Sequence, residues 1–170
     1  MFDNLVYFSE IAGQKTDIMQ KLGLPENKFV LCTIHRDNNT DDPERLQQIF
    51  SAMCHIAENM HLDIVIPLHP RTSKIIENKL PSGLFSRLSG NKHIHLIPPV
   101  SYLEMIMLEK NARLILTDSG GVQKEAYFFK KPLVVARPET EWIEIIENGA
   151  GIIADADETK IIDSVQHFID

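Results

Sequence analysis

Six short apolar segments, in which polar residues do not alternate with apolar ones, constrain the fold of this chain most strongly. A strand with one solvated face shows such alternation, whereas an uninterrupted apolar strand is buried on both faces, as in a parallel sheet covered by helices. We therefore predict buried strands at residues 29–34, 64–68, 94–97, 114–117, 133–136 and 151–153.

Helical patterns occupy the stretches between these segments. Asp42 precedes Pro43, an acidic N-cap followed by proline at the first helical position, and apolar residues then recur at helical spacing as far as Met60. Residues 101–104 are Ser-Tyr-Leu-Glu, a capping box that starts a second helix. We predict further helices at residues 121–129 and 141–147, the latter closed by Gly149, and a last one with Ile161, Ile162, Val165, Phe168 and Ile169 on one face.

The alternation of strands and helices predicts the fold class. Repeated βα units in 170 residues, a length typical of one domain, indicate an α/β protein with an open, doubly wound, mostly parallel sheet of Rossmann type. We expect a single domain over residues 1–170. Residues 1–27 have more helical than sheet character and should form a helical lead-in outside the sheet.

Polar residues follow four of the six predicted strands. Ligands of an open α/β sheet bind beyond the carboxyl ends of the strands, so these residues should meet at one edge. Their convergence predicts a binding site. The candidate residues are His35, Arg36, Asn39, His69, Arg71, Ser119, Gly120, Gly121, Glu125, Arg137, Thr140 and Glu141.

Residues 114–125 contain the strongest single element, a strand that runs through Gly120 and Gly121 into a helix. The unpaired N–H groups of such a helix start point at one spot, and a diphosphate can approach a backbone without side chains. Ser119 can cap the helix or donate to a phosphate, and Glu125 can accept hydrogen bonds from two ribose hydroxyls. A plain N-cap and tight turn, with Glu125 solvated, is the alternative for this turn taken alone.

The pairs His35–Arg36 and His69–Arg71 each allow two interpretations. The histidine can carry a proton near neutral pH and the arginine can bind a phosphate, or the histidine can be satisfied by backbone and the arginine by water. A metal site built from His35, His69 and Asp118 lacks any supporting ligand spacing, so we expect neither metal nor cofactor.

The charge balance bears on possible partners. The chain has 17 Lys and Arg against 24 Asp and Glu, a formal charge of −7, without a basic run that could follow a nucleic-acid backbone. A small anion remains compatible with this charge. Cys32 and Cys54 lack C-x-x-C spacing and are expected to be reduced thiols. Because no export signal or long apolar span is present, we expect a cytoplasmic protein that does not engage a membrane.

Assembled, these motifs resemble the C-terminal half of the non-hydrolysing UDP-N-acetylglucosamine 2-epimerases over nearly the whole chain. The family pattern H-R-x-E-N is matched by His35, Arg36 and Asn39, whereas Asn38 replaces the acid. Residues 69–72 match the family form H-P-R-T. The replaced acid leaves His35 as a candidate, rather than an assigned, catalytic residue.

Three more family patterns occur in the same order. Residues 97–102 are similar to I-x-P-L/V-x-Y, whose backbone lies near the uracil in the family, so Ile97 and Pro98 join the candidate ligand contacts. Residues 118–125 match D-S-G-G-x-Q-x-E, and residues 137–141 match R-x-x-T-E. The sequence around these last two motifs further resembles the branch that acts on UDP-2,3-diacetamido-2,3-dideoxyglucuronate.

The resemblance implies an isomerase of GT-B arrangement, in which two Rossmann-like domains face each other and the C-terminal one holds UDP. It implies inversion at C2 of a UDP-2-acetamido sugar by elimination of UDP to a glycal and re-addition, for bacterial surface polysaccharide precursors. Acid–base carboxylates come largely from the N-terminal half, and the full-length enzyme is expected to be a homodimer.

The two ends of the chain resemble points inside the family's longer sequence. Residues 1–3 are similar to the segment that joins the two halves, and Asp170 comes before the segment that crosses back to the first domain. We therefore expect one domain of a longer polypeptide, without its N-terminal catalytic half, that binds UDP weakly and is inactive alone.

Two other functions share parts of this pattern. A GT-B glycosyltransferase would use a similar diphosphate turn but would require an acceptor. A receiver-type signalling domain is suggested by Asp118 at a strand end and by the pair Lys131–Pro132. In receivers, however, Lys-Pro follows a strand, whereas here it precedes residues 133–136, and two glycines follow the aspartate.

Overall fold

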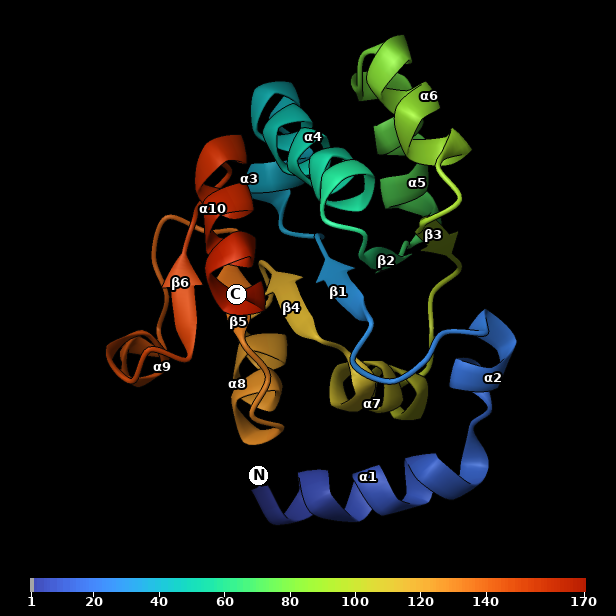
Figure 1. The fold of residues 1–170 in the computed structure, drawn as a ribbon, viewed down its shortest axis with the longest axis vertical. Coiled ribbons are helices and arrows are strands. Elements are labelled where there is room, and N and C mark those ends of the chain that lie inside the picture. The colour runs from blue at the N-terminus through green and yellow to red at the C-terminus, as the bar shows by residue number, and fades with distance from the viewer. Residues whose placement is uncertain (1) are drawn as a thin grey trace.

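Six parallel strands form one sheet at the centre of the molecule (Figure 1). The computed structural model describes residues 2–170, so Met1, part of the segment that resembles the junction between the two halves, lies outside the described residues. The sheet order is β3-β2-β1-β4-β5-β6. The strands are β1 Phe29–Thr33, β2 Asp63–Pro67, β3 Ile94–Ile97, β4 Leu114–Thr117, β5 Leu133–Val135 and β6 Gly151–Ile153.

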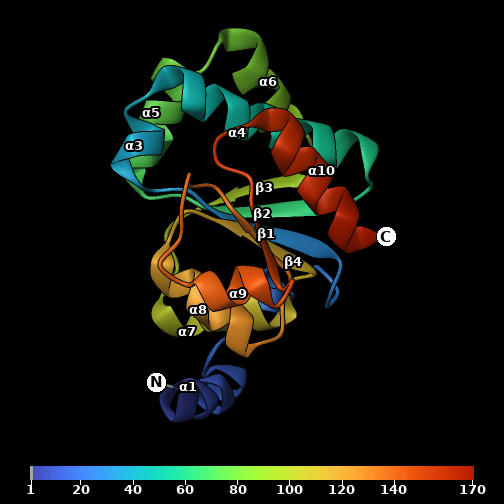
Figure 2. The ribbon, with the colours of Figure 1, turned by 90° about the vertical axis from the view of Figure 1, so that its left-hand side faces the viewer.

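Helices cover both faces of the sheet, which confirms the predicted doubly wound α/β class. Figure 2 shows α3, α4, α5, α6 and α10 on one face and α7, α8 and α9 on the other, with α1 outside the second layer against α7. The helices are α1 Phe2–Lys15, α2 Ile18–Leu22, α3 Asp37–Thr40, α4 Pro43–Asn59, α5 Pro70–Lys79, α6 Ser82–Gly90, α7 Tyr102–Asn111, α8 Gly120–Phe128, α9 Ile143–Glu147 and α10 Glu158–Ile169. None of these helices is long and apolar enough to cross a membrane.

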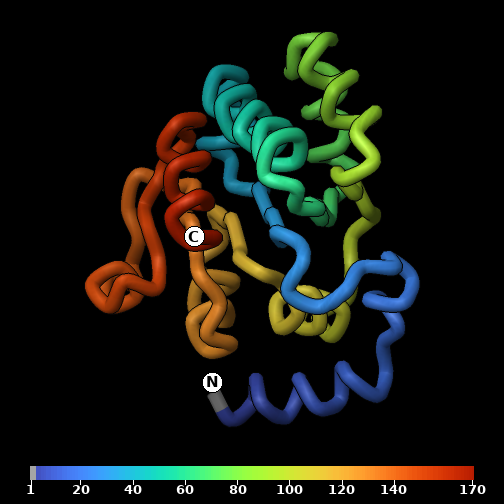
Figure 3. Tube along the Cα trace, viewed as in Figure 1, coloured from blue at the N-terminus to red at the C-terminus, as the bar shows by residue number. Residues whose placement is uncertain are grey.

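The strand order reverses direction between β1 and β4. The Cα trace runs from β1 outward to β2 and β3, returns across the sheet through α7, and continues from β4 to β5 and β6 (Figure 3). Neighbouring strands β1 and β4 are in register from Val30 opposite Leu114 to Thr33 opposite Thr117. Because helices leave these two strands toward opposite faces, a crevice opens at their carboxyl ends, where ligands of such folds bind.

Apolar side chains pack on each face of the sheet. Phe50, Met53 and Ile56 of α4 join one cluster, while Leu108 of α7 and Ala126 of α8 join the other. The uninterrupted apolar strands thus fill both layers, as their sequence pattern predicts. This two-sided packing fixes the strand ends that carry the polar residues.

Three sequence signals for helix ends are confirmed in detail. Asp42 caps α4 through its side chain, which accepts from the N–H of Glu44 and of Arg45, and Pro43 is the first helical residue. Ser101 and Glu104 form both hydrogen bonds of the capping box at the start of α7. Gly149, with φ of 73°, follows α9 in the left-handed region that favours glycine.

Three helices, α3, α5 and α6, were not predicted from the sequence. The motif at residues 69–72 contains the missed signal, because His69 is the N-cap of α5 and Pro70 its first residue. The topology also excludes the receiver alternative, since receivers use the strand order 2-1-3-4-5 and this sheet has order 3-2-1-4-5-6.

Candidate functional site

Asp118 organises the crevice between β1 and β4. It directly follows β4, its side chain is 0% exposed, and its carboxylate accepts hydrogen bonds from two backbone N–H groups beyond β1. These are the N–H of His35, at 3.1 Å, and of Arg36, at 2.9 Å. The carboxylate therefore fixes the chain that leaves β1 against the start of the β4–α8 turn.

Asn39 extends this network to β5. Its amide nitrogen donates to Asp118 Oδ2 at 2.9 Å and to the carbonyl of Ala136 at 3.0 Å, while its oxygen accepts from Arg45 Nε. Arg45 is in turn paired with Asp155 at 2.7 Å. Asn39 is itself 0% exposed. The structure thus places this candidate ligand contact beneath the site, as a group that joins strand ends.

The turn from β4 into α8 exposes the start of the helix. Thr117 Oγ1 lies 2.6 Å from Thr33 Oγ1 and accepts the N–H of Ser119, and Ser119 Oγ accepts the N–H of Val122. Ser119 is thus the N-cap of α8, which is one of the two roles predicted for it from the sequence. Helix geometry gives the N–H groups of Gly120 and Gly121 no partner within α8, which leaves two donors at its positive end.

The chain after β5 closes over this helix start. Trp142 Nε1 donates to the carbonyl of Gly120 at 2.8 Å, and a Cβ atom placed on Gly120 would collide with the carboxylate of Glu141. A side chain at residue 120 would therefore require the carboxylate of Glu141 to move. Arg137 pairs with Glu141 at 3.0 Å, which orients its guanidinium at the same edge.

The side chain of Thr140, a candidate ligand contact, forms its hydrogen bonds within the protein. Its hydroxyl lies 2.6 Å from Gln123 Oε1, and it accepts the N–H of Trp142. Gln123 is buried in α8. The two side chains thus hold the loop after β5 against α8.

Two arginines line a cavity of about 320 Å³ at this edge. Arg36 comes from the chain after β1 and Arg137 from the chain after β5, and Asp37, Asn38, Pro138 and Glu139 complete the lining. Guanidinium groups bind phosphate through paired N–H donors. Asp37 and Glu139 share this lining, so the two guanidinium groups are the phosphate-binding groups of a cavity of mixed charge. Because Arg36, α8 and Arg137 follow the neighbouring parallel strands β1, β4 and β5, the cavity and the start of α8 belong to the same end of the sheet.

Glu125 of α8 is hydrogen-bonded to α7. It is 8% exposed, and Tyr102 Oη donates to its carboxylate at 3.1 Å. Burial, followed by the charge of Glu125 and this hydrogen bond, raises the pKa of Tyr102 to about 12. Glu125 is therefore not the solvated helix residue of the plainer interpretation, and the phenol next to it stays protonated as a donor.

The two histidine candidates lie in different settings. The side chain of His35 is 58% exposed, and its Nε2 lies 3.8 Å from Asp118 Oδ1 at the crevice. His69 Nδ1 instead accepts the N–H of Arg71 as the N-cap of α5, at 3.2 Å. Arg71 approaches Asp37 and Asp41 at 3.6 and 3.8 Å. Within residues 2–170, no cluster of three His, Cys, Asp or Glu side chains is arranged to hold a metal ion.

Ile97 and Pro98 lie at the end of the outermost strand. Ile97 ends β3 and pairs in register with Pro67 of β2. The chain that follows leads to Tyr102, and the Tyr102–Glu125 hydrogen bond connects it to α8. Both candidates thus lie shortly before the helix whose first residue contacts Glu125.

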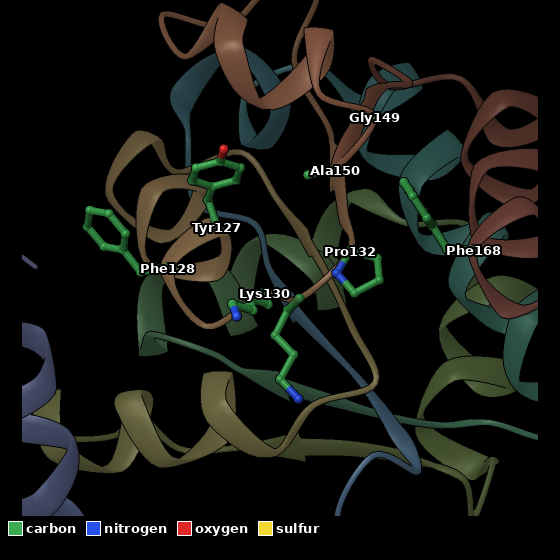
Figure 4. Close-up of a pocket in the computed structure, with 8 residues that line it drawn as sticks. Tyr127, Phe128, Lys130, Pro132, Gly149, Ala150 and Phe168 are labelled. Atoms are coloured by element: carbon green, nitrogen blue, oxygen red, sulfur yellow. The ribbon is translucent and has the colours of Figure 1, made fainter.

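A second cavity lies at the opposite edge of the sheet. Its volume is about 560 Å³, and it is lined by residues before β5 and β6, by the end of α8 and by α10. Figure 4 shows Tyr127 and Phe128 on one side and Phe168 on the other, with Pro132 between them. Apart from Lys130 and Lys131, its side chains carry no charge.

Sequence-only expectations missed three contributors to the site. Asp118 was expected within the motif but not as the residue that fixes the strand ends, and Tyr102 was not expected to contact Glu125. Glu109, buried in α7, also acts on Glu125. For Glu109, the available signal was an acidic residue at a helix position that packs against the core, where an apolar residue is expected.

Comparison with known proteins places this geometry in a family. The family model for UDP-N-acetylglucosamine 2-epimerase matches residues 1–170. A UDP-N-acetylglucosamine 2-epimerase homolog of Methanococcus maripaludis is 41% identical over 169 residues, which cover 99% of this chain and 45% of the relative. UDP-2,3-diacetamido-2,3-dideoxy-D-glucuronate 2-epimerase of Pseudomonas aeruginosa is also 41% identical, over 98% of this chain and 43% of the relative.

A solved structure shows the same fold. The UDP-GlcNAc 2-epimerase of Methanocaldococcus jannaschii, in complex with UDP-GlcNAc and UDP, aligns with a TM-score of 0.88 at 38% identity, over 99% of this chain and 46% of that one. The chain thus spans a little less than half the length of these relatives, as one half of a GT-B arrangement. It belongs to the UDP-N-acetylglucosamine 2-epimerase family, of which it represents the C-terminal portion.

Proposed function

We propose that this chain is the UDP-binding domain of an isomerase that inverts C2 of a UDP-2-acetamido sugar. The observation that carries the proposal is the convergence of Arg36, the start of α8 and Arg137 at the carboxyl ends of the neighbouring parallel strands β1, β4 and β5. Those groups suit a diphosphate, because they combine a helix N-terminus with guanidinium donors. The M. jannaschii relative bound to UDP-GlcNAc and UDP supports this choice of ligand.

In the proposed complex the diphosphate contacts the N–H groups of Gly120 and Gly121 and the side chains of Arg36 and Arg137. The ribose hydroxyls donate to Glu125, whose carboxylate is held by Tyr102 Oη. The uracil lies against the backbone at Ile97 and Pro98. His69, Arg71, Thr140 and Glu141 would border or support the ligand, and Asn39 and Asp118 would hold the loops that bind it.

The chemistry assigned to this half is stabilisation of the leaving group. A base removes the proton from C2 while the C1–O bond breaks, and the electron pair of that bond leaves with the UDP oxygen. Re-addition of UDP to the glycal returns the bond, with the proton delivered to the opposite face of C2. The helix dipole and the two arginines stabilise the negative charge that develops on UDP.

Acid–base groups for C2 belong, in this proposal, to a further domain of a longer polypeptide that forms homodimers. His35 is the one candidate for proton transfer here, since its ring is exposed at the crevice. The equal identities to two differently named relatives leave both UDP-N-acetylglucosamine and the diacetamido-uronate derivative as candidate sugars.

Titration calorimetry with UDP, and an assay of the 170-residue chain with UDP-N-acetylglucosamine, test the proposal. We expect measurable UDP binding and no epimerised product. Turnover by this chain alone would contradict the assignment of acid–base groups to another domain. Absence of UDP binding would contradict the nucleotide site itself. Transfer of labelled sugar to an acceptor by a longer form would favour the glycosyltransferase alternative.

A further inference from the structure

Glu109 is a buried acidic residue that is not among the proposed ligand contacts. It lies near the end of α7, its side chain is 0% exposed, and neither of its carboxylate oxygens has a donor among the described residues. A buried carboxylate without donors is strongly unfavourable, so such a group holds its proton. A protonated carboxyl group is itself a donor and requires an acceptor.

That acceptor is Glu125 of α8. Tyr102, which leaves the same face of α7, donates to the Glu125 carboxylate at 3.1 Å, so this face of α7 points toward Glu125. Glu125 is also the group whose charge and hydrogen bonding act on Glu109, and a hydrogen bond between two carboxyl groups requires one proton between them. Burial raises the pKa of Glu109 first, followed by the negative charge of Glu125 and the hydrogen bond to it. The proton belongs on Glu109 because its side chain is the more deeply buried and because Glu125 already accepts from Tyr102.

Glu125 is thus held by two residues on one face of α7. Tyr102 and Glu109 are seven residues apart in α7, two helical turns, so their side chains leave the same face. The titratable groups that interact electrostatically with Glu109 are Glu125 of α8 and Tyr102 of α7. Helix α1 presents the apolar residues Leu5, Phe8 and Ala12 to this layer, and the Phe8 ring packs edge-on against Tyr102.

We propose that Glu109 is a positioning residue for nucleotide binding: its protonated carboxyl group donates to Glu125 and, together with Tyr102, holds that carboxylate in the orientation that accepts the ribose hydroxyls. This inference rests on the proposed function of Glu125. It assigns Glu109 no contact with the nucleotide, because Glu109 has no exposed surface.

Infrared difference spectroscopy tests the shared proton without any ligand. The wild-type chain minus the Glu109→Gln variant, both at neutral pH in deuterated buffer, should show the C=O stretch of one protonated carboxyl group. The exposed acid Glu77 provides a matched control, because the Glu77→Gln difference spectrum should lack that band. A wild-type spectrum without the band, or a band that persists in Glu109→Gln, would overturn the proposal.

Calorimetric titration with UDP tests the positioning role. Glu109→Gln keeps an N–H donor toward Glu125 and should bind UDP within about twofold of wild type, whereas Glu109→Met keeps the volume but not the donor and should lose about fivefold to tenfold in affinity. Both variants remove the acid but only Gln keeps a donor, so a difference between their UDP affinities reports the hydrogen bond to Glu125.

Equal UDP affinities of wild type and Glu109→Met would overturn the positioning role. The variant Glu125→Ala separates this failure from a failure of the proposed site. If Glu125→Ala weakens binding while Glu109→Met does not, only the inference about Glu109 is wrong. If neither weakens binding, the ribose lies elsewhere and both proposals are wrong, even where the infrared band is present.

Discussion

The sheet has a cavity at each end of its strands, and the two cavities differ in volume and in the chemistry of their lining. We call these two ends of the strands the edges of the sheet. The edge before β5 and β6 has the roomier cavity, about 560 Å³, with mostly apolar lining that includes Tyr127, Pro132 and Phe168. The edge beyond β1, β4 and β5 has a cavity of about 320 Å³, flanked by Arg36 and Arg137.

The polar edge is also the better supported of the two. Beneath it, Asp118 and Asn39 join the ends of β1, β4 and β5 by hydrogen bonds between buried groups. The presence of hydrogen-bond donors in fixed positions therefore identifies the candidate site better than cavity volume does. In the proposed function, recognition of a nucleotide depends on the strand ends that hold the donors, and the variants of each edge test this.

Removal of the carboxylate that joins the strand ends should have the largest effect. Asp118→Ala leaves the N–H groups of His35 and Arg36 and the amide of Asn39 without their acceptor. Unpaired buried donors are costly, so we expect a loss of about 3–4 kcal/mol in the free energy of unfolding, measured by urea denaturation. The exposed Asp163→Ala should change it by less than about 0.5 kcal/mol. Equal small losses would show that the network does not hold the site.

Loss of the proposed ligand contacts should come next. Glu125→Ala and Ser119→Ala each remove a hydrogen bond that involves a charged group, and each should weaken UDP binding by about 1.5–3 kcal/mol in titration calorimetry. Glu77→Ala, an exposed acid on α5, serves as the control and should bind as wild type does. Unchanged affinity in both site variants would place the pocket elsewhere.

A truncation at the opposite edge should affect stability but not binding. Phe168 is partly buried against the core and lines the apolar cavity. Phe168→Ala should lower the free energy of unfolding by about 1–2 kcal/mol, because only part of its side chain leaves water on folding. Its UDP affinity should equal that of wild type. A loss of affinity similar to that of Glu125→Ala would reverse the comparison of the two edges.

The smallest effect concerns the proton on Glu109. Its pKa is raised on folding from an ordinary value of 4.5, so the folded state binds more protons than the unfolded state above that pH, and stability from this group is lost as pH rises. Glu109→Gln removes the dependence. We expect the variant to gain about 1 kcal/mol or more on wild type between pH 5 and pH 7, in urea denaturation at both values. Parallel pH profiles would contradict a shared proton.

The strand pattern was predictable because it depends on local sequence. All six strands lie within one residue of their predicted bounds, since an uninterrupted apolar run requires burial on both faces wherever it occurs. Helix α5 was missed because it is rich in polar residues and begins within a motif that was not interpreted as a helix start. Pro70 after His69 carried the signal for its start.

The candidate site was predictable as a location but not as a set of contacts. Convergence of the residues after β1, β4 and β5 follows from the rule for strand ends in such sheets. The burial of Asn39 and the contact between Tyr102 and Glu125 depend on how side chains from separate helices meet. Residue types along a sequence do not specify such meetings, which is why Asn39 was expected at the ligand and Glu109 was not noticed.

Backbone amide chemical shifts during a UDP titration test the central claim most directly. If UDP binds at the carboxyl ends of β1, β4 and β5, the largest shifts should belong to Gly120, Gly121 and Arg137, while Lys131, Gly149 and Ala150 at the opposite edge stay unchanged. Large shifts at Lys131, Gly149 and Ala150, with Gly120 and Gly121 unmoved, would contradict the account.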